Sequence, residues 1–433
     1  MSHTYRPMGA GRSHDPHAGV VFVRGCGDTL WDTNGKAYLD LICGYSALNL
    51  GHAHPRLLDA ARTQLSQLAF CTGATHPWRS ELEKKVAELV DGPALESNET
   101  KSKVWLSSTG ARAVEIAWKI AFANRPGKMM RFHLSYHGRS LATAHISDTR
   151  GSDALRYDVG VNASMEDQEL HCVIPFPMCG SQCDGKCEDC DASIDVARHW
   201  LDCHSEGTSA MILEPAIGAR GYYFASGAYF RRLVKLLRSY GVQVISDEIQ
   251  MGLGRLGSMI ASIDDGWKPD FVVLGKSLGG GITPISAVIG DRDRMDKLPQ
   301  GFESETFAAN PLACRVALEA ISVLNDESLM ASVSRRGNLF RETLREAISA
   351  GCRVDGRGFA TVIDLSGLSN QGARSDDASR IAWDWVCHAQ GQGLLVHLTG
   401  VERNRIAIIP PLNIEDAALQ QAIEILSSFW KVK

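Results

Sequence analysis

Apolar residues follow two recurring patterns along most of this chain. Short runs of consecutive apolar and β-branched residues, as in SKVWLSS, SAMILEP, VQVISDE and FVVLG, are typical of buried strands. Between these runs apolar residues recur at helical spacing. In ARAVEIAWKIAFANR, one side of the helix would carry Val114, Ile116, Ala117, Ile120 and Ala121. Continuously apolar strands that alternate with helices predict a parallel sheet covered by helices on both faces.

The same patterns divide the chain into three parts. Residues 1–70 contain short strands with turn signals at CGD and TNGK. The alternating pattern runs through residues 71–310, and helical segments interrupted by strands such as ATVIDL and RIAII occupy residues 311–433. We therefore expect an α/β fold with a large domain at 71–310, built on a mostly parallel sheet, and a smaller α+β domain built from the N- and C-terminal segments.

Composition narrows the class of protein. The 433 residues fit about two domains, and a content of 44% hydrophobic and 22% charged residues is typical of a folded globular protein. A formal net charge of -5 argues against a nucleic-acid partner. The N-terminus lacks the apolar core of a secretory signal, and no apolar run is long enough to span a bilayer. These features predict a cytoplasmic protein without a membrane partner.

Polar residues that directly follow the apolar runs are the first candidates for a site. In parallel α/β sheets, ligands bind beyond the carboxyl ends of the strands. The candidates at these positions are Thr109-Gly110, Tyr136 to Arg139, Glu214-Pro215, Asp247 to Gln250, and Lys276.

Lys276 and Asp247 suggest the chemistry of a Schiff-base enzyme. Lys276 follows a buried strand and precedes three glycines, so its amine would enter a cleft where burial lowers its pKa. A neutral amine of this kind can form a Schiff base, whereas the alternative is a surface lysine at a strand end. Asp247 ends another buried strand and needs a cationic partner, such as a protonated pyridine nitrogen. The alternative for Asp247 is a turn-capping role.

Two further segments are consistent with a bound planar phosphate compound. The turn from Ser108 to Ala111 opens a helix, and free amide groups at a helix start bind phosphate; the alternative is a plain N-cap. Tyr136 offers an aromatic face for stacking, unless it is a core tyrosine at the rim of the sheet. For His137 a structural role is favoured over metal binding, because no matching ligand cluster lies nearby in the sequence.

From about Gly19 to its end, the chain resembles the class III aminotransferases, which are pyridoxal-phosphate (PLP) enzymes of fold type I. The most specific similarity is SDEIQMGLGRLG followed by PDFVVLGKSLGGG, which resembles the cofactor signature of the family. Other segments that resemble family motifs are DTLWDTNGKAYLDLICGYSALNLGHAHP, SYHGRS, LEPAIGARG, ETFAANPLACRVALEAI and IPPLNI.

The resemblance implies roles for individual residues. Lys276 would bind PLP as a Schiff base and move the proton at the substrate carbon, and Asp247 would pair with the pyridine nitrogen. Thr306 would hold the phosphate bound by the other subunit of a homodimer. The remaining implied cofactor contacts are Gly110, Ala111, Tyr136, His137, Glu214, Ile249 and Gln250. The implied reaction is ping-pong transamination from an amine or ω-amino donor to a keto acid.

Within the family, the chain looks most like the ornithine and other ω-amino-acid aminotransferases. Tyr45 resembles a tyrosine that contacts a substrate carboxylate, and Arg139 lies where the family has an arginine that grips a carboxylate.

Three departures put the donor in doubt and favour a specialised one. The phosphate turn contains Ala111-Arg112 in place of a hydroxyl residue and Glu. Ala219-Arg220 replaces a Glu that gates ornithine-type sites, and Ala407 replaces an Arg before the Pro-Pro pair. Arg405, two residues earlier, faces the same side of a strand but lies farther from the site. Arg112 and Arg220 are alternative carboxylate partners.

An insert near residues 179–190 carries a cysteine cluster. Cys179, Cys183, Cys187 and Cys190 lie in PMCGSQCDGKCEDCD with the spacing C-x3-C-x3-C-x2-C. Four thiols are the ligand count of a tetrahedral zinc site or an iron–sulfur cluster, and four ligands leave no open position for catalysis. We expect structural zinc before an iron–sulfur cluster. The alternative is an insert with free thiols or one disulfide.

Other reactions and roles remain compatible with the sequence. The family also contains PLP-dependent racemases, aminomutases and a decarboxylase. A non-catalytic relative that binds a partner or a metal is an alternative of another class, although it would have no reason to retain Lys276, Asp247, Gln250 and Thr306 together.

Overall fold

A mostly parallel sheet forms the centre of the protein in the computed structural model, which describes residues 16–71, 75–92, 100–148, 171–299, 301–369 and 375–432. The seven strands lie in the order β4-β12-β11-β10-β7-β5-β6. All run parallel except β12, which pairs antiparallel with β4 and β11. Their bounds are β4 Ser102–Ser107, β5 Lys128–Phe132, β6 His171–Ile174, β7 Thr208–Leu213, β10 Gln243–Asp247, β11 Phe271–Leu274 and β12 Ser286–Asp291.

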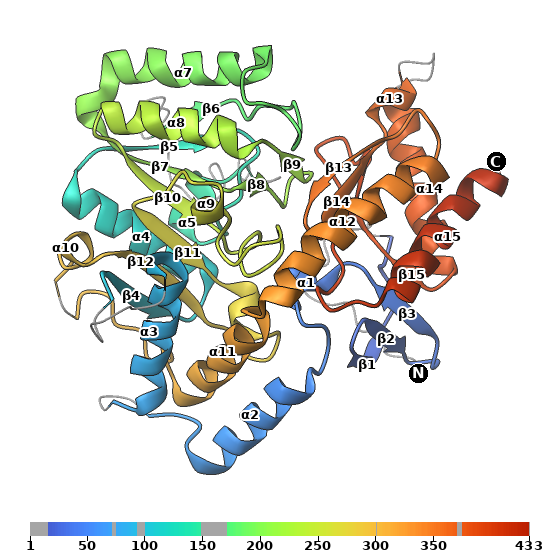
Figure 1. The fold of residues 1–433 in the computed structure, drawn as a ribbon, viewed down its shortest axis with the longest axis horizontal. Helices are drawn as coiled ribbons and strands as arrows, with labels where there is room; N and C mark the ends of the chain where they lie inside the picture. The colour runs from blue at the N-terminus through green and yellow to red at the C-terminus, as the bar shows by residue number, and fades with distance from the viewer. Residues whose placement is uncertain are drawn as a thin grey trace, which may run out of the picture.

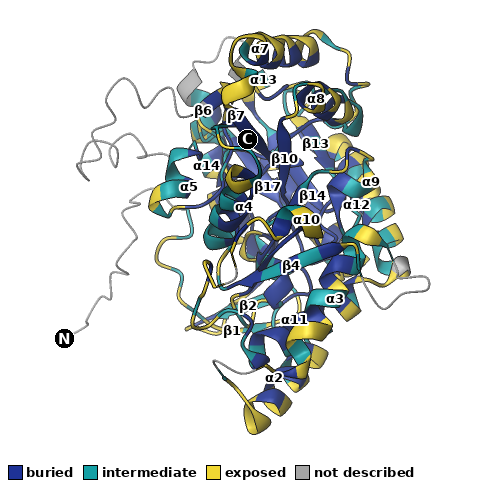
Figure 2. Ribbon diagram, turned by 90° about the vertical axis from the view of Figure 1, so that its left-hand side faces the viewer, coloured by how far each residue is buried: buried dark blue, intermediate teal, exposed yellow. Residues whose placement is uncertain are grey.

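Helices cover both faces of this sheet, as the sequence predicts. Alternate strand residues point to opposite faces, so Met129 packs under α4 (Gly110–Asn124) while Met130 packs under α7 (Glu188–His204) and α8 (Gly227–Ser239). The face that carries Met130 continues toward β4, where it packs against α2 (Pro55–Gln67), α3 (Pro77–Asp91) and α11 (Pro311–Leu324). The strands are dark and buried in Figure 2, whereas the helices keep exposed outer faces. Burial on both faces explains why the strand sequences are continuously apolar.

A second sheet lies beside the first and belongs to the C-terminal part of the chain (Figure 1). Its antiparallel strands follow the order β13-β14-β17-β16, and we call this the C-terminal sheet. The strands are β13 Arg353–Arg357, β14 Ala360–Asp364, β16 His397–Thr399 and β17 Arg405–Ile408. The surrounding helices are α12 Glu327–Ala347, α13 Ser366–Ser369, α14 Ser375–Gly391 and α15 Asp416–Val432.

The N-terminal strands join the C-terminal part of the chain. β1 (Phe22–Cys26), β2 (Thr29–Asp32) and β3 (Ala37–Asp40) form hairpins, and β3 pairs in parallel with β15 (Leu394–Leu395). The short α1 (Cys43–Ser46) follows, and a two-stranded hairpin of β8 (Ala216–Ile217) and β9 (Tyr223–Phe224) follows β7. The remaining short helices are α5 Leu141–His145, α9 Ala261–Asp264 and α10 Arg292–Met295. None of the helices in the described ranges has both the length and the apolar character needed to cross a membrane.

Candidate active site

The carboxyl ends of the parallel strands bring the main candidate residues together. Asp247 ends β10, Glu214 follows β7, and the segment around Tyr136 follows β5. The backbone amide of Tyr136 donates to Glu214 Oε1 at 2.8 Å, and Asp247 Oδ2 lies 2.7 Å from His137 Nδ1. Lys276 follows β11, and its amine is attracted by both Asp247 and Glu214. The predicted clustering at this edge of the sheet is therefore present in the structure.

Lys276 has an unusual backbone and an unusual amine. It begins a short 3₁₀ turn, Lys276–Gly279, with φ of 45°, a left-handed conformation that costs free energy for a residue with a side chain. Burial lowers the pKa of its amine from 10.5 to about 8, although the negative charges of Asp247 and Glu214 act in the opposite direction. The site thus holds an amine that exchanges its proton near neutral pH, as a Schiff-base lysine requires.

Asp247 and His137 form a buried pair. The side chain of His137 is 0% exposed and that of Asp247 is 4% exposed, and the backbone amide of Ile249 donates to the other carboxylate oxygen at 3.1 Å. Ser147 Oγ accepts a hydrogen bond from the backbone amide of His137 at 2.8 Å, which helps to hold the backbone of the histidine in place. The sequence favoured a structural role for His137, and the structure places it against the carboxylate that it orients.

Glu214 is a buried carboxyl group that supports the Tyr136 loop. Besides the amide of Tyr136, it accepts the backbone amide of Gly218 at 3.1 Å. Burial raises its pKa to about 7, and the nearby Asp247 adds to this effect while His137 opposes it. This carboxyl group therefore joins the loop that carries the Tyr136 ring to the segment that follows β8.

Ile249 and Gln250 follow Asp247 and extend the site in two directions. A Cβ on Gly110 would lie 2.9 Å from Ile249 Cδ1, so the isoleucine packs directly against the start of α4. Gln250 Nε2 donates to the hydroxyl of Tyr222 at 2.7 Å. Asp247, Ile249 and Gln250 of the predicted cofactor signature thus follow one strand end, and they contact His137, the start of α4 and Tyr222 respectively.

The turn before α4 has the geometry of an anion site. Thr109 caps the helix by accepting the amide of Arg112 at 3.3 Å, so Gly110 and Ala111 begin α4 in its first turn. Glu305 supports the strand end, since its carboxylate accepts Ser107 Oγ at 2.5 Å and the amide of Ser108 at 3.0 Å.

Arg112, suggested above as a possible carboxylate partner for the substrate, is already engaged by acidic residues of the protein. Its guanidinium pairs with Glu115 at 3.3 Å and with Glu303, whose side chain is 0% exposed. Lys119 binds the other oxygen of Glu303 at 2.6 Å.

The two substrate candidates, Arg139 and Tyr45, are both exposed. Arg139 is exposed, and its guanidinium lies 5.9 Å from the centre of the Tyr136 ring. Tyr45 is 44% exposed, and its ring meets that of His397 edge-on at 4.9 Å. Thr306 is exposed on a turn after β12. Ala407 is fully buried in apolar surroundings, so the position of the expected arginine is part of the core.

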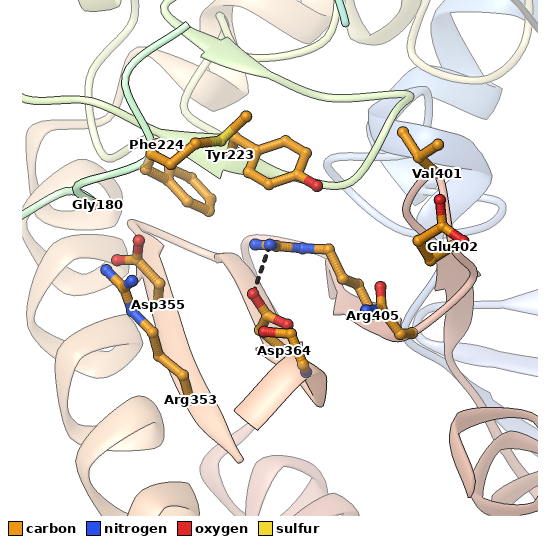
Figure 3. A pocket seen from close by; sticks show the side chains of 12 residues that line it. Gly180, Tyr223, Phe224, Arg353, Asp355, Asp364, Val401, Glu402 and Arg405 are labelled. Carbon is orange, nitrogen blue, oxygen red and sulfur yellow. Dashed lines mark hydrogen bonds and ion pairs between the residues drawn. The ribbon is translucent and has the colours of Figure 1, made fainter. Parts of the chain in front are cut away.

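Arg405 lies in a pocket of 390 Å³ between the β8–β9 hairpin and the C-terminal sheet (Figure 3). It binds Asp364 at 2.7 Å and stacks 4.0 Å from the ring centre of Tyr223. Other residues that line the pocket include Gly180, Arg353, Asp355 and Glu402.

Tyr222 and Arg255 are residues that the sequence reasoning missed. The buried Tyr222 hydroxyl anchors Gln250, and burial raises its pKa, with a further contribution from Tyr45 nearby. Arg255 is 0% exposed and donates to Ser46 Oγ, Asn49 Oδ1 and the backbone carbonyls of Phe359 and Pro410. Its position in the GLGRLG motif was the available signal, but no local pattern indicated that it joins three distant segments.

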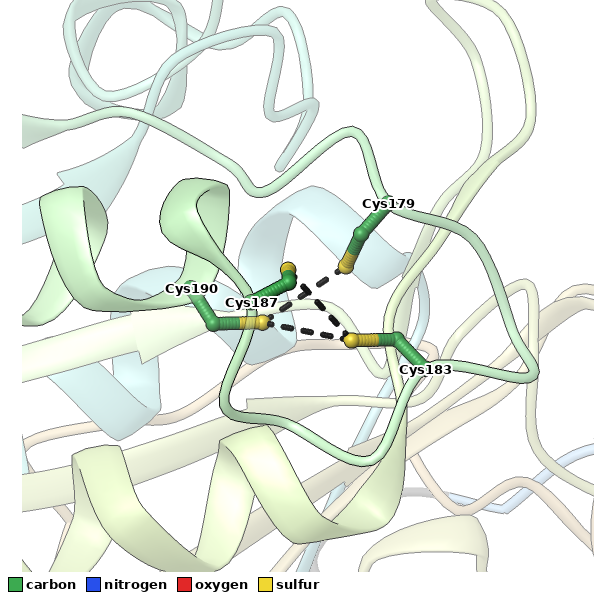
Figure 4. Close-up of side chains that lie close together, drawn as sticks. All are labelled: Cys179, Cys183, Cys187 and Cys190. Carbon is green, nitrogen blue, oxygen red and sulfur yellow. Dashed lines mark hydrogen bonds between the residues drawn. The ribbon is translucent and has the colours of Figure 1, made fainter.

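The four cysteines of the insert converge in space (Figure 4). All four sulfur atoms lie within 4.8 Å of one another. Cys179 and Cys190 have sulfurs 3.5 Å apart, and Cys183 lies 3.4 Å from Cys187 and 3.8 Å from Cys190. They are free thiols that surround a common centre.

Comparisons with known proteins identify the family of the chain. The family model described as aminotransferase class-III matches residues 10–429. The chain is 32% identical to the 5-aminovalerate aminotransferase of Pseudomonas aeruginosa and 30% identical to the 4-aminobutyrate aminotransferase of Escherichia coli, with 97% of this chain and 95% of each relative covered. The crystal structure of the ornithine aminotransferase of Toxoplasma gondii ME49 is similar with a TM-score of 0.80 and 30% identity, over 95% of this chain and 91% of that one.

These relatives are named as aminotransferases, and nothing in the comparisons favours the racemase, aminomutase or non-catalytic alternatives. The chain therefore belongs to the class III aminotransferases and is a PLP-dependent transaminase.

Proposed function

We propose that this transaminase takes the amino group of an ω-amino donor, a primary amine with a distal carboxylate, and passes it to a keto acid. The buried amine of Lys276, with its pKa lowered to about 8, supports the amino transfer, and the exposed Arg139 beside Tyr136 carries the proposed donor class. Near pH 8 this amine both accepts and returns a proton readily, which is the requirement for a group that moves a proton at the substrate carbon.

The residues around Lys276 fit PLP. Asp247, oriented by His137, would face the pyridine nitrogen, and the amides of Gly110 and Ala111 would face the phosphate. Ile249 packs against the start of α4, 2.9 Å from where a Cβ on Gly110 would lie, and would cover one face of the ring. Tyr136 would cover the opposite ring face, and Gln250 would reach the ring hydroxyl. When bound, PLP supplies an electron sink for the negative charge that develops at the substrate carbon.

Arg139 is the residue proposed to recognise the distal carboxylate. It lies beside Tyr136 and is exposed, whereas Arg112 and Arg405 are held by acidic residues of the protein. Tyr45 would assist in this role. The relatives named for 4-aminobutyrate and 5-aminovalerate use donors of this class, whose reacting amine and carboxylate are at opposite ends.

A donor panel followed by visible absorption tests the proposal. The holoenzyme should lose its yellow colour with ω-amino acids, and a keto acid should restore it. Pentylamine has the same chain as 5-aminovalerate without the carboxylate. We expect R139A to raise the KM for 5-aminovalerate more than the KM for pentylamine. The ratio of the two KM values should increase at least about tenfold over the wild-type ratio. A protein that reacts only with α-amino acids, or an R139A variant that loses both donors equally, contradicts the proposed donor class.

We also propose that the enzyme is a homodimer in which Thr306 reaches the phosphate bound by the other subunit. Phe302 and Phe307 flank this residue, and each is 63% exposed. Phe307 also meets Phe70 at 4.8 Å, so these two rings form an exposed aromatic pair of the kind that partner surfaces cover. Light scattering after size-exclusion chromatography should give twice the chain mass for the wild type and a lower value for F307D. A monomeric wild-type holoenzyme that turns over donors contradicts this proposal.

Separately from the aminotransferase site, we propose that the four cysteines bind a structural metal ion, zinc in preference to an iron–sulfur cluster. Four protein ligands complete a tetrahedral shell and leave no position for a substrate. The metal would therefore take no part in amino transfer.

A further inference from the structure

We infer that zinc bound by the four cysteines fastens the insert to the C-terminal sheet, and so holds one wall of the pocket around Arg405. This inference rests on the proposed zinc site and is independent of the proposed donor. It concerns the loop from Pro175 to Cys187, which links β6 to α7 and contains no regular element between them.

The sulfur positions fit a single ion. Zinc–sulfur bonds of about 2.3 Å in a tetrahedron place neighbouring sulfurs about 3.8 Å apart. Three of the six separations are 3.4, 3.5 and 3.8 Å, close to this value, and all six are within 4.8 Å. An iron–sulfur cluster places several irons and inorganic sulfides between its thiolates, so its ligands must stand farther apart than the ligands of one ion.

The start of α7 offsets part of the charge of such a site. Four thiolates and Zn²⁺ carry a net charge of -2, which burial makes costly unless cations or dipoles lie nearby. Arg232 donates to the carbonyl of Gly185, and its charge is shared with Asp191, which it binds at 2.7 Å. Cys187 is the N-cap of the 17-residue helix α7, and Cys190 lies in its first turn, where the helix dipole favours thiolate.

The segment between the first two ligands contacts β13 directly. Ser181 Oγ donates to Asp355 Oδ1 at 2.7 Å, and Arg353 donates to the backbone carbonyl of Cys179 at 3.1 Å. Gly180 has φ of +91°, and a Cβ there would lie 2.5 Å from the Arg353 guanidinium. The positive φ favours glycine at this position, and the loop backbone lies close to the side chains of Arg353 and Asp355. Figure 3 shows Gly180 beside Arg353 and Asp355 at the edge of the pocket.

The metal is what holds the loop close to β13. Cys179, Cys183 and Cys187 pack against the apolar core under α7 and α8, to which Cys190 belongs. Phe176 is buried in the same core, but between Cys179 and Cys187 the loop has two glycines, two charged residues and no apolar side chain other than cysteine. Ordering this part of the loop therefore depends on cross-linking. Zinc joins the end of the loop that contacts β13 to the end that starts α7. Release of zinc should therefore loosen the contact of Ser181 with Asp355.

Metal analysis of anaerobically purified holoenzyme is the first part of the test. We expect one zinc per chain in the wild type and in K276A. Because K276A removes the lysine of the aminotransferase site, zinc in this variant shows that the metal site does not depend on the proposed amino transfer. Substitution C183S removes a direct ligand, so zinc affinity should fall by more than the about 10- to 100-fold typical of outer-shell partners. The matched control is C203S, an exposed cysteine at the far end of α7, which should retain zinc. Iron in place of zinc, or loss of four thiols to disulfides with no metal, overturns the inference.

Hydrogen exchange of the wild type before and after zinc removal by a chelator is the second part. Amides of residues 353–357 should exchange on the order of tenfold faster without zinc, while those of β4 remain unchanged. Substitution S181A should keep its zinc yet show faster exchange in β13. Zinc removal that leaves β13 exchange unaltered refutes the fastening role while the metal site stands.

Discussion

Replacing Lys276 by methionine, an unbranched apolar side chain one atom shorter, will raise the free energy of unfolding of the cofactor-free protein near pH 7. The folded protein lowers the pKa of this amine from 10.5 to about 8, mainly because the amine is buried. Since the unfolded chain holds the proton more tightly, folding must accommodate a charge that its surroundings disfavour. Active-site groups commonly cost stability in this way.

The magnitude follows from the shift. Each pKa unit corresponds to about 1.4 kcal/mol, so a charged Lys276 costs the folded state about 3 kcal/mol below pH 8. Above pH 8 the folded protein releases the proton while the unfolded chain keeps it up to about pH 10.5, so this cost declines across that window. Between about pH 7 and about pH 9.5, about 2 kcal/mol of the gain from K276M should disappear.

Urea unfolding of both apoproteins at one fixed protein concentration provides the assay, because association would make the stability depend on concentration. The control is K235M on the exposed face of α8, which should change the free energy of unfolding by less than about 0.5 kcal/mol. A K276M gain that stays the same at both pH values would refute the reasoning, since it would show that packing and not charge is responsible.

Three further substitutions test the site and its support. D247N should lower the rate of amino transfer by about 100-fold or more in single turnovers while the protein stays yellow, because it removes one preorganised charge; an unchanged rate would contradict the role of Asp247. G110A should weaken PLP binding by about tenfold in an absorbance titration, because its Cβ would lie 2.9 Å from Ile249 Cδ1. Adding I249V to G110A removes that atom and should restore binding. R255K should lower the free energy of unfolding by about 2–4 kcal/mol, as measured by urea unfolding. A lysine cannot bind at once the two backbone carbonyls and the side chains that the guanidinium binds. Stability within error of the wild type would show that these bonds contribute nothing.

Much of the fold was predictable because its pattern is local. The segment ARAVEIAWKIAFANR becomes α4, and each apolar side chain expected on its inner side is buried against the sheet. The runs VQVISDE and FVVLG become β10 and β11, with Asp247 and Lys276 at their carboxyl ends. Apolar periodicity depends on neighbours within a few residues of each other, so it is legible in the sequence without knowledge of the fold.

The contacts that shape the site were not predictable, because they join residues far apart along the chain. His137 and Asp247 are separated by 110 residues, and Ser107 and Glu305 by 198. Their meeting depends on the strand order β4-β12-β11-β10-β7-β5-β6, which apolar patterns do not encode. The same holds for Arg405, which looked like a spare cation in the sequence and is bound to Asp364 in the structure.

By itself, the sequence determined the strands and helices, the family, the lysine and aspartate of the site, and the spacing of the cysteines. Only the tertiary structure decided which carboxylates lower or raise the pKa of which groups, which arginines are already paired, and whether four sulfurs share one centre. The physical reason is that secondary structure follows from interactions between near neighbours in the chain. Electrostatic pairing and metal geometry depend on distances of a few ångströms, and only the packing of distant segments sets those distances.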